Sequence, residues 1–120
     1  LVQMPDSLLP PRTNSALEVD GIVKDGTLTW NFNVGVAKVY AMRFRYYNPE
    51  AVRNLHVKIT DLNGVVYKED DITFLQTPAK KTKRRNTSIT TGSQINAGSY
   101  IVTLSGEGLD KMLFEKLTIE

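Results

Sequence analysis

The stretch TLTWNFNV, from Thr27 to Val34, alternates apolar and polar side chains at every second position. Leu28, Trp30 and Phe32 share one side of an extended chain with Val34, and threonines and asparagines share the other side. Successive side chains of a β-strand point to opposite faces, so this period of two predicts a strand with one buried face. Such a strand needs a second layer of structure to cover its large apolar side chains.

The same alternation recurs outward from this stretch in both directions. It predicts further strands over residues 16–23, 39–46, 55–60, 86–91, 99–105 and 112–119. Another strand begins at residues 65–67, and residues 70–74 either continue it or start a new one. Turn-forming dipeptides separate them: Asp25-Gly26, Asn63-Gly64 and Ala97-Gly98. About eight short strands at close spacing favour an all-β fold, an antiparallel β-sandwich of the jelly-roll type.

The C-terminal stretch fits two patterns. Leu109, Met112, Leu113 and Leu117 have helical spacing. Two glycines precede this stretch, and it ends in strand-forming residues, so we predict a strand that extends to Ile119.

The length of 120 residues suits one domain. Residues 1–14 contain Pro5, Pro10 and Pro11 and show no clean period, which predicts an extended linker or arm. Residues 15–120 are expected to form a single β-sandwich domain. No stretch approaches the roughly 20 apolar residues of a membrane span, so we expect no membrane partner.

Composition excludes several kinds of site. The chain has no cysteine, which excludes disulfides and thiolate metal sites, and its one histidine excludes a zinc site built on several imidazoles. That histidine, His56, is predicted to face solvent from a strand. The basic run at residues 80–85 has no interleaved aromatics for base stacking, so we expect no nucleic-acid partner. We expect instead a solvated loop, or an edge strand that lysine protects from aggregation.

We do not expect an enzyme. Glycoside hydrolysis needs two carboxylates facing each other across a cleft. The acidic residues fall mainly at predicted turns, as in Glu69-Asp70-Asp71, and a sandwich this small has little room for a deep cleft. We keep a small hydrolase as the least favoured of three alternative functions; the other two are given at the end of this section.

Sugar binding needs a flat aromatic to pack on the C–H face of a pyranose and polar groups to hydrogen-bond its hydroxyls. Two places satisfy this requirement. Tyr47 and Asn48 lie where a strand ends, with Arg45 on the same face as Tyr47, and Tyr67 follows the turn that contains Asn63. We take these five residues as candidate carbohydrate contacts.

A calcium site is a further candidate, because calcium prefers several hard oxygen ligands. The first predicted strand carries Glu18 and the last carries Glu115. If these strands are neighbours, the two carboxylates approach each other; the alternative is two surface glutamates on paired strands.

Five segments taken in order resemble the galactose-binding-like carbohydrate-binding modules of families 6 and 35 and the malectin-like domains. They are residues 16–19 (ALEV), 40–48 (YAMRFRYYN), 55–64 (LHVKITDLNG), 97–104 (AGSYIVTL) and 114–119 (FEKLTI). The chain also looks like the C-terminal domain of some Bacteroidetes glycoside hydrolases, including family 2 β-galactosidase-like enzymes.

The resemblance implies a jelly roll, secretion or periplasmic export, attachment to a glycan-degrading enzyme, and a structural calcium near Glu18 and Glu115. The sequence departs from the family at two places. Residues 80–85 (KKTKRR) lack the aromatic often found there, and Glu115 stands where aspartate is usual. Two functions therefore stay open: a glycan-binding accessory module, and a structural sandwich that packs on the catalytic domain without binding sugar.

Overall fold

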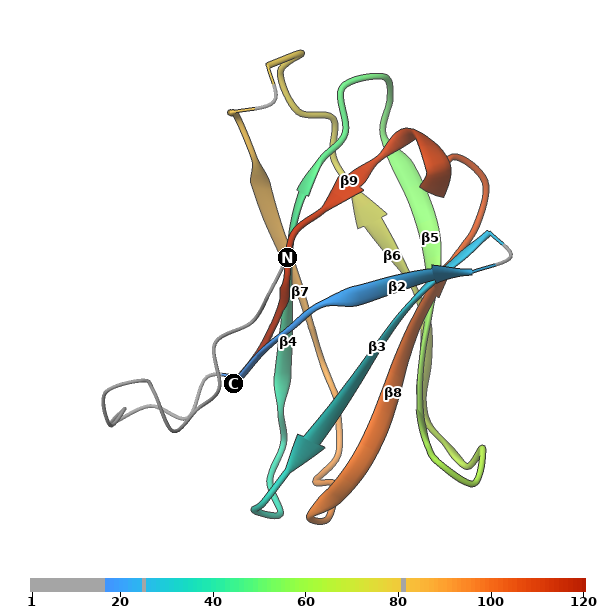
Figure 1. Cartoon of the computed structure of the whole chain (residues 1–120), viewed down its shortest axis with the longest axis vertical. Coiled ribbons are helices and arrows are strands. Elements are labelled where there is room, and N and C mark those ends of the chain that lie inside the picture. Colours follow the sequence, from blue (N-terminus) through green and yellow to red (C-terminus); the bar gives the residue numbers. More distant parts are fainter. Residues whose placement is uncertain (1–16, 25, 81) are drawn as a thin grey trace.

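A computed structural model describes residues 17–24, 26–80 and 82–120. They form two antiparallel sheets that face each other (Figure 1). The first sheet contains β1 (Leu17–Val19), β4 (Ala41–Tyr47), β7 (Arg85–Thr90), β9 (Leu113–Phe114) and β10 (Leu117–Ile119). The second contains β2 (Gly21–Lys24), β3 (Thr27–Val34), β5 (Arg53–Asp61), β6 (Val66–Phe74) and β8 (Gly98–Ser105).

The strand order is β1-β10-β4-β7 in the first sheet, with β9 also pairing with β4, and β2-β3-β8-β5-β6 in the second. The only helix among the described residues is the 3₁₀ turn η2 (Leu109–Lys111). None of the described helical segments has the length and apolarity needed to cross a bilayer. The prediction of an all-β antiparallel sandwich is confirmed, whereas the expected linker at 1–14 lies outside the described residues.

The core joins the two sheets through a ring of four aromatic side chains. Trp30 and Phe74 come from the second sheet, and Phe44 and Phe114 come from the first. Their ring centroids are 5.4 Å apart for Trp30–Phe44, 5.8 Å for Phe44–Phe74, 5.5 Å for Phe74–Phe114 and 5.9 Å for Trp30–Phe114. All four contacts are edge-to-face, the geometry that the ring quadrupole favours.

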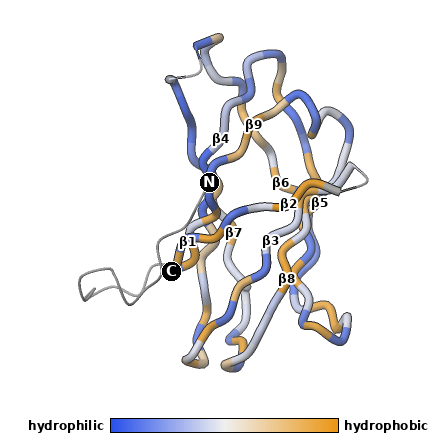
Figure 2. The backbone as a smooth tube through the Cα atoms, viewed as in Figure 1, coloured by the Kyte–Doolittle hydropathy of each residue, from blue (hydrophilic) through white to orange (hydrophobic). Residues whose placement is uncertain are grey.

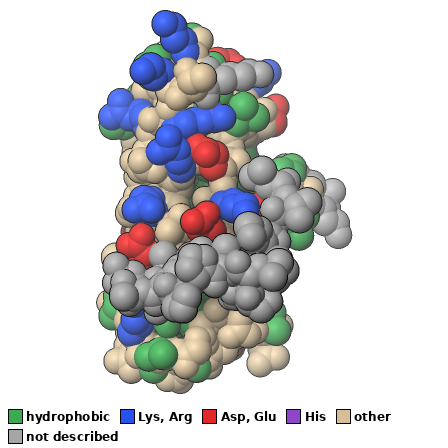
Figure 3. Space-filling view, turned by 60° about the vertical axis from the view of Figure 1, so that its left-hand side comes forward, with side chains coloured by type: hydrophobic (Ala, Val, Ile, Leu, Met, Phe, Trp, Pro, Cys, Tyr) green, Lys and Arg blue, Asp and Glu red, His purple; other side chains and the backbone are tan. Residues whose placement is uncertain are grey.

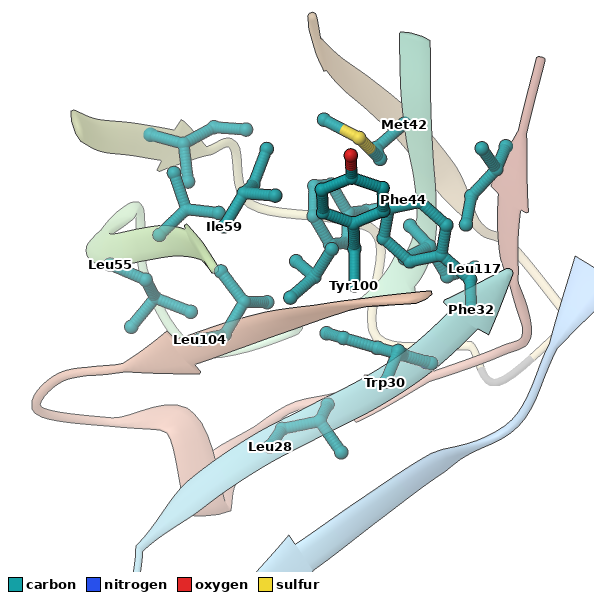
Figure 4. Packing of buried hydrophobic residues seen from close by; sticks show 14 of the residues in the cluster. Leu28, Trp30, Phe32, Met42, Phe44, Leu55, Ile59, Tyr100, Leu104 and Leu117 are labelled. Carbon is teal, nitrogen blue, oxygen red and sulfur yellow. The ribbon is translucent and has the colours of Figure 1, made fainter. Parts of the chain in front are cut away.

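The alternation predicted for the central strands is confirmed. The four apolar side chains of β3 are buried, and so are Tyr40, Met42, Phe44 and Tyr46 in and just before β4. Figure 4 shows Trp30 and Phe32 of β3 approaching Met42 and Phe44 of the opposite sheet. Tyr100 and Leu104 of β8 complete the same interior.

Two predicted strands are each divided in the structure. The stretch expected as one strand over 16–23 forms β1 in the first sheet and β2 in the second, since the chain changes sheets at Asp20 (Figure 1). Val23, considered for the interior, is 75% exposed on the outermost strand of its sheet. The stretch expected as one strand over 112–119 forms β9 and β10, and η2 precedes it.

Gly21 makes the change of sheet sterically feasible. It is the first residue of β2 and pairs with Trp30. A Cβ atom at this position would lie 2.8 Å from Leu28 Cδ1 and 2.8 Å from Trp30 Nε1. Real Cβ atoms do not approach other atoms so closely, so only glycine lets β2 lie against the indole.

His56 bridges β5 and β6 on the outer face of the second sheet. Its Nδ1 lies 3.0 Å from Asp71 Oδ1, and its Nε2 lies 2.7 Å from Glu69 Oε2. The hydrogen bonds to Asp71 and then Glu69 raise the pKa of His56 above its usual 6.5, and the bond to His56 lowers the pKa of Glu69. The predicted solvent-facing strand position is confirmed, because the side chain remains 41% exposed.

We expect Gly21→Ala to lower the free energy of unfolding by about 1–3 kcal/mol, because the added methyl group overpacks Trp30 and Leu28. Gly35→Ala is the matched control, since nothing lies within 4 Å of a Cβ built there. Urea unfolding followed by tryptophan fluorescence measures both variants. Equal stability of the two variants would contradict the close packing of Gly21.

A pH titration tests the bridge at His56. Because its pKa is raised on folding, the bridge stabilises the fold fully below about pH 6.5 and loses this effect as pH rises through the folded pKa. NMR titration should give a His56 pKa above 6.5 that falls in Asp71→Asn. Asp70→Asn, which removes the same charge one residue away, should leave the His56 pKa near its wild-type value.

Candidate functional site

A shallow pocket lies on the outer face of the first sheet, opposite to the core. It has a volume of about 330 Å³ and is lined by Glu18, Arg43, Arg45, Asn86, Glu115, Lys116 and Thr118. We call these seven residues, with Tyr47 and Arg84 beside them, the pocket face. Figure 3 shows this side of the molecule, where lysine and arginine side chains run along the surface with carboxylates between them.

Strand pairing explains why these side chains meet. Thr118 of β10 pairs with Glu18 of β1 on one side and with Arg43 of β4 on the other, so the three residues form one row across the sheet. Arg45 pairs with Asn86 of β7 in the next row. Paired residues project to the same face, and the inner face holds the core, so these polar side chains face outward.

The break between β9 and β10 places Glu115 in this pocket. Its backbone N–H donates to the carbonyl oxygen of Arg45 at 2.9 Å, and its carboxylate accepts from Arg45 Nε at 2.8 Å. Arg84 Nε lies 3.5 Å from the same carboxylate oxygen. Arg43 Nη1 lies 3.4 Å from Glu120 Oε1.

Tyr47 lies beside the pocket, two residues beyond Arg45 on β4. The guanidinium carbon of Arg84 lies 5.4 Å from the centre of its ring. A cation at this distance over an aromatic face is attracted by the ring quadrupole. The structure therefore brings Arg45 and Tyr47 together, as expected, and adds a second arginine that covers one face of the tyrosine.

Asn48 does not belong to this face. Its side chain is 0% exposed, and its Nδ2 donates to the carbonyl oxygens of Ala51 at 2.6 Å and Phe74 at 3.2 Å. Its backbone N–H donates to Thr77 Oγ1 at 3.0 Å. The expectation that Asn48 contacts sugar is wrong for this structure, because the residue is buried where it fixes the turn after β4.

Asn63 lies in the turn between β5 and β6 of the other sheet, and Tyr67 follows it in β6; hydrophobic and hydrophilic residues both occur around this turn (Figure 2). The Tyr67 ring packs edge-on against Tyr100, with centroids 5.4 Å apart, and its hydroxyl donates to Asp61 Oδ2 at 3.2 Å. These two candidates thus form a patch separate from the pocket face, and their contact with sugar stays a prediction.

The residues of the pocket do not fit a calcium ion. Calcium takes six to eight oxygen ligands, and the pocket offers the carboxylates of Glu18 and Glu115 beside two arginines and a lysine. Glu115 is already engaged by two guanidinium groups. No cluster of three or more histidine or acidic side chains among the described residues has the arrangement of a metal site.

Sequence reasoning missed most of the pocket face. Arg43 was recognisable as an outward position of β4, but Asn86 and Thr118 come beside β4 only through strand pairing. Lys116 lies in the link between β9 and β10. Arg84 belongs to the basic run expected as a solvated loop or a lysine-protected edge strand. The structure corrects that expectation for Arg84, whose side chain is only 21% exposed against Tyr47 and Glu115.

An apolar hollow of about 420 Å³ lies elsewhere, between β2 and the segment from η2 to β9. Its lining includes Val23, Leu28, Trp30, Met112 and Leu113. Among these residues, Val23 is 75% exposed and Leu113 is 46% exposed. The indole N–H of Trp30 is buried and has no hydrogen-bond partner among the described residues.

No protein-family model and no curated protein matches this sequence. Several solved structures match its fold. A family 35 carbohydrate-binding module from Paenibacillus barcinonensis has a TM-score of 0.61 and 17% identity, over 88% of this chain and 91% of the module. The family 35 module of Cellvibrio japonicus Abf62 has a TM-score of 0.60 and 22% identity, over 78% of this chain and 64% of that one.

An isomalto-dextranase from Arthrobacter globiformis T6 also matches, with a TM-score of 0.56 and 16% identity over 78% of this chain. The match spans only 15% of that enzyme. At these identities the likeness concerns the architecture alone. The chain has the two-sheet β-sandwich fold of the family 35 carbohydrate-binding modules.

Proposed function

We propose that this chain is a non-catalytic carbohydrate-binding accessory module of a secreted or periplasmic glycoside hydrolase. Two family 35 carbohydrate-binding modules share its fold. The isomalto-dextranase, whose structure contains panose, matches it over a small part of a much longer chain. Both observations favour a module that works beside a catalytic domain.

The pocket face is the proposed binding site, and one observation carries this assignment. An aromatic side chain, Tyr47, lies beside a pocket lined by several hydrogen-bonding side chains, among them Arg45, Asn86 and Thr118. Guanidinium, amide and hydroxyl groups can all hydrogen-bond to sugar hydroxyls, and the tyrosine supplies an apolar surface with a polar tip. A pocket this shallow suits a sugar at the surface of a longer glycan.

The same geometry argues against catalysis by this domain. Glu18 and Glu115 are the two carboxylates that line the pocket, and Arg45 and Arg84 hold Glu115. A glycosidase needs two carboxylates free to face each other across the scissile bond, whereas Glu115 is held by two guanidinium groups in a shallow pocket. The proposal therefore places hydrolysis in another domain.

We expect Tyr47→Ala to weaken glycan binding by about tenfold, because the substitution removes the aromatic surface and releases Arg84 from its contact. Affinity electrophoresis against xylans, galactans, dextran and mucin glycans measures the effect. Tyr67→Ala, at the separate patch on the second sheet, should leave the affinity within about twofold of wild type. If the wild-type chain bound none of the glycans in the panel, this result would contradict the proposed function.

A second candidate function rests on the apolar hollow beside β2. A surface that exposes Val23 and Leu113 around such a hollow is typical of an interface that another protein surface covers. We propose as the alternative that the hollow packs on the catalytic domain of the same polypeptide, and that the sandwich supports that domain without binding sugar.

This alternative predicts a difference between the isolated domain and the full-length protein. The isolated domain should bind a hydrophobic dye such as anilinonaphthalene sulfonate, and Val23→Ser with Leu113→Ser should reduce the dye fluorescence. In the full-length protein, the same pair of substitutions should lower activity on small soluble substrates, with Val39→Ser as a matched control. Unchanged activity in both variants would argue for the glycan-binding role alone.

A further inference from the structure

The outer edge of β7 is a part of the molecule that the proposed function does not use. β7 is the last strand in the order of the first sheet, and no described strand pairs with its other side (Figure 1). An unpaired strand edge presents backbone N–H and C=O groups with which another extended chain can pair. The edge therefore carries the hydrogen-bonding groups that a partner strand needs.

The pairing of β7 with β4 determines which backbone groups face outward. The Thr91 N–H, just after β7, donates to the carbonyl oxygen of Tyr40 at 2.8 Å. Hydrogen bonding toward one neighbour alternates along an antiparallel strand, so every second residue back from Thr91 bonds to β4 and the residues between face away. The N–H and C=O groups of Asn86, Ser88 and Thr90 consequently point to the open edge.

Each of the other outermost strands has a feature that discourages further pairing. β1 and β2 have only three and four residues. β6 has nine residues, but the run from Lys68 to Asp71 within it is charged at every position. Its pairing with β5 also shifts register between Ile59 and Thr60. Short length, charge and bulges are common protections of sheet edges.

β7 lacks these protections along most of its length. Its six residues are RNTSIT, and Arg85 at the first position is the only charged residue. The strand contains no proline or glycine, and its pairing with β4 runs from Arg85 to Thr90 without a register shift. Among the outermost strands of the described sheets, β7 is therefore the best suited to accept a further strand.

Basic side chains gather at one end of this edge. Lys80 and Lys83 precede β7 and Arg85 begins it; all three are exposed, and none forms an ion pair with another described residue. The Lys83 N–H donates to the Lys80 carbonyl oxygen at 2.8 Å in a tight turn that brings the two lysines together. We call these three residues the basic cluster. Their charge is available to attract the carboxylates of a partner.

Packing defines the remaining side chains of a suitable partner strand. Thr87 and Ile89 of β7 are half-buried, and Ile89 packs against the core. Residues of an added strand that lie beside these two also point toward the interior, because neighbouring residues in a sheet project to the same face. Apolar side chains are favoured at these positions, and polar side chains are favoured at the positions between them.

Strand direction decides where the acidic residues of the partner lie. The described strand pairs are all antiparallel. An antiparallel strand added to β7 ends beside Arg85, so its C-terminal end meets the basic cluster. A second copy of β7 offers no acidic residue there, because the residues that follow Thr90 are TGSQI. Charge complementarity therefore favours a different chain as the partner.

We propose that the β7 edge binds an extended segment of another protein, which adds to the first sheet as a further antiparallel strand. The segment alternates apolar and polar residues and ends in acidic residues that contact the basic cluster. Backbone hydrogen bonds to Asn86, Ser88 and Thr90 supply the pairing, and the charges fix the direction. This interaction goes beyond glycan binding and does not depend on it.

Two synthetic peptides that differ only in terminal charge test the proposal. The peptide TVTVTVTEEE has the required alternation and an acidic C-terminal end, and TVTVTVTKKK is its matched control. Fluorescence anisotropy of the labelled peptides with the full chain should give at least about tenfold tighter binding of the glutamate peptide. Added salt should weaken this binding, because it screens exposed charges.

Amide hydrogen exchange locates the contact. Saturating glutamate peptide should slow the exchange of the Asn86, Ser88 and Thr90 amides by at least about tenfold, because each N–H gains a hydrogen-bond acceptor. The amides of β6, the outermost strand on the same side of the other sheet order as its last member, provide an internal control and should not change. Protection of β6 in place of β7 would contradict the proposed edge.

Variants of the edge test the backbone pairing. Ser88→Pro removes one outward N–H and leaves the hydrogen bonds of β7 to β4 in place, because proline is tolerated on an edge strand when its nitrogen faces outward. It should weaken peptide binding by at least about tenfold, whereas Ser88→Ala keeps the N–H and should stay within about twofold of wild type. Melting temperatures establish that both variants are folded.

Charge reversal tests the basic cluster without altering β7 itself. Lys80→Glu together with Lys83→Glu should weaken binding of the glutamate peptide by at least about tenfold. Lys111→Glu reverses an exposed charge on η2 and should change the affinity less than about twofold. This pair of variants keeps the test decisive if Ser88→Pro unfolds the domain.

Several results would overturn the inference. They are the absence of binding by the glutamate peptide, equal affinity for the two peptides, and wild-type affinity after charge reversal at Lys80 and Lys83. A dimer of the wild-type chain in sedimentation velocity that Ser88→Pro abolishes would assign the edge to a second copy and would also overturn it. Each of these results leaves the proposed glycan binding intact, because that binding uses the pocket face.

Discussion

The edge-to-face contact of four aromatic rings between the sheets is the interaction on which the structure depends. Trp30 and Phe74 from one sheet meet Phe44 and Phe114 from the other, each ring against its neighbour at centroid distances between 5.4 and 5.9 Å. These large side chains bury the most apolar surface per residue and fix the separation of the layers. They also fix which side of each strand faces outward.

The packing of these four rings determines which side chains form the pocket face. Once Phe44 points inward from β4, its neighbours Arg43 and Arg45 must point outward, because side chains alternate along a strand. Phe114 of β9 completes the cluster of four aromatic side chains. The next residue, Glu115, lies beyond the end of β9 and contacts Arg45. The polar chemistry of the outer face is therefore positioned by packing on the inner one.

The same aromatic cluster explains the apolar hollow. Trp30 is so large that β2 can lie against it only with glycine at position 21. β2 is a short outer strand with exposed Ile22 and Val23. The chain beyond η2 covers the indole only in part, through Met112 and Leu113. A charged face and an apolar hollow thus occupy different surfaces of one small sandwich, which permits one of them to meet a ligand and the other a neighbouring domain.

The sequence by itself determined the fold class and the core, because the alternation along a strand is a local pattern. It predicts the buried faces of TLTWNFNV and YAMRFRYY without information from any other segment. It also placed Arg45 and Tyr47 on one face, since they are two residues apart. The tertiary structure alone decided that Asn48 is buried, that Val23 is exposed, and that Arg84, Asn86 and Thr118 join Arg45. These facts depend on which strands pair and where the chain changes sheets, and pairing partners lie many residues apart, beyond the reach of a local pattern.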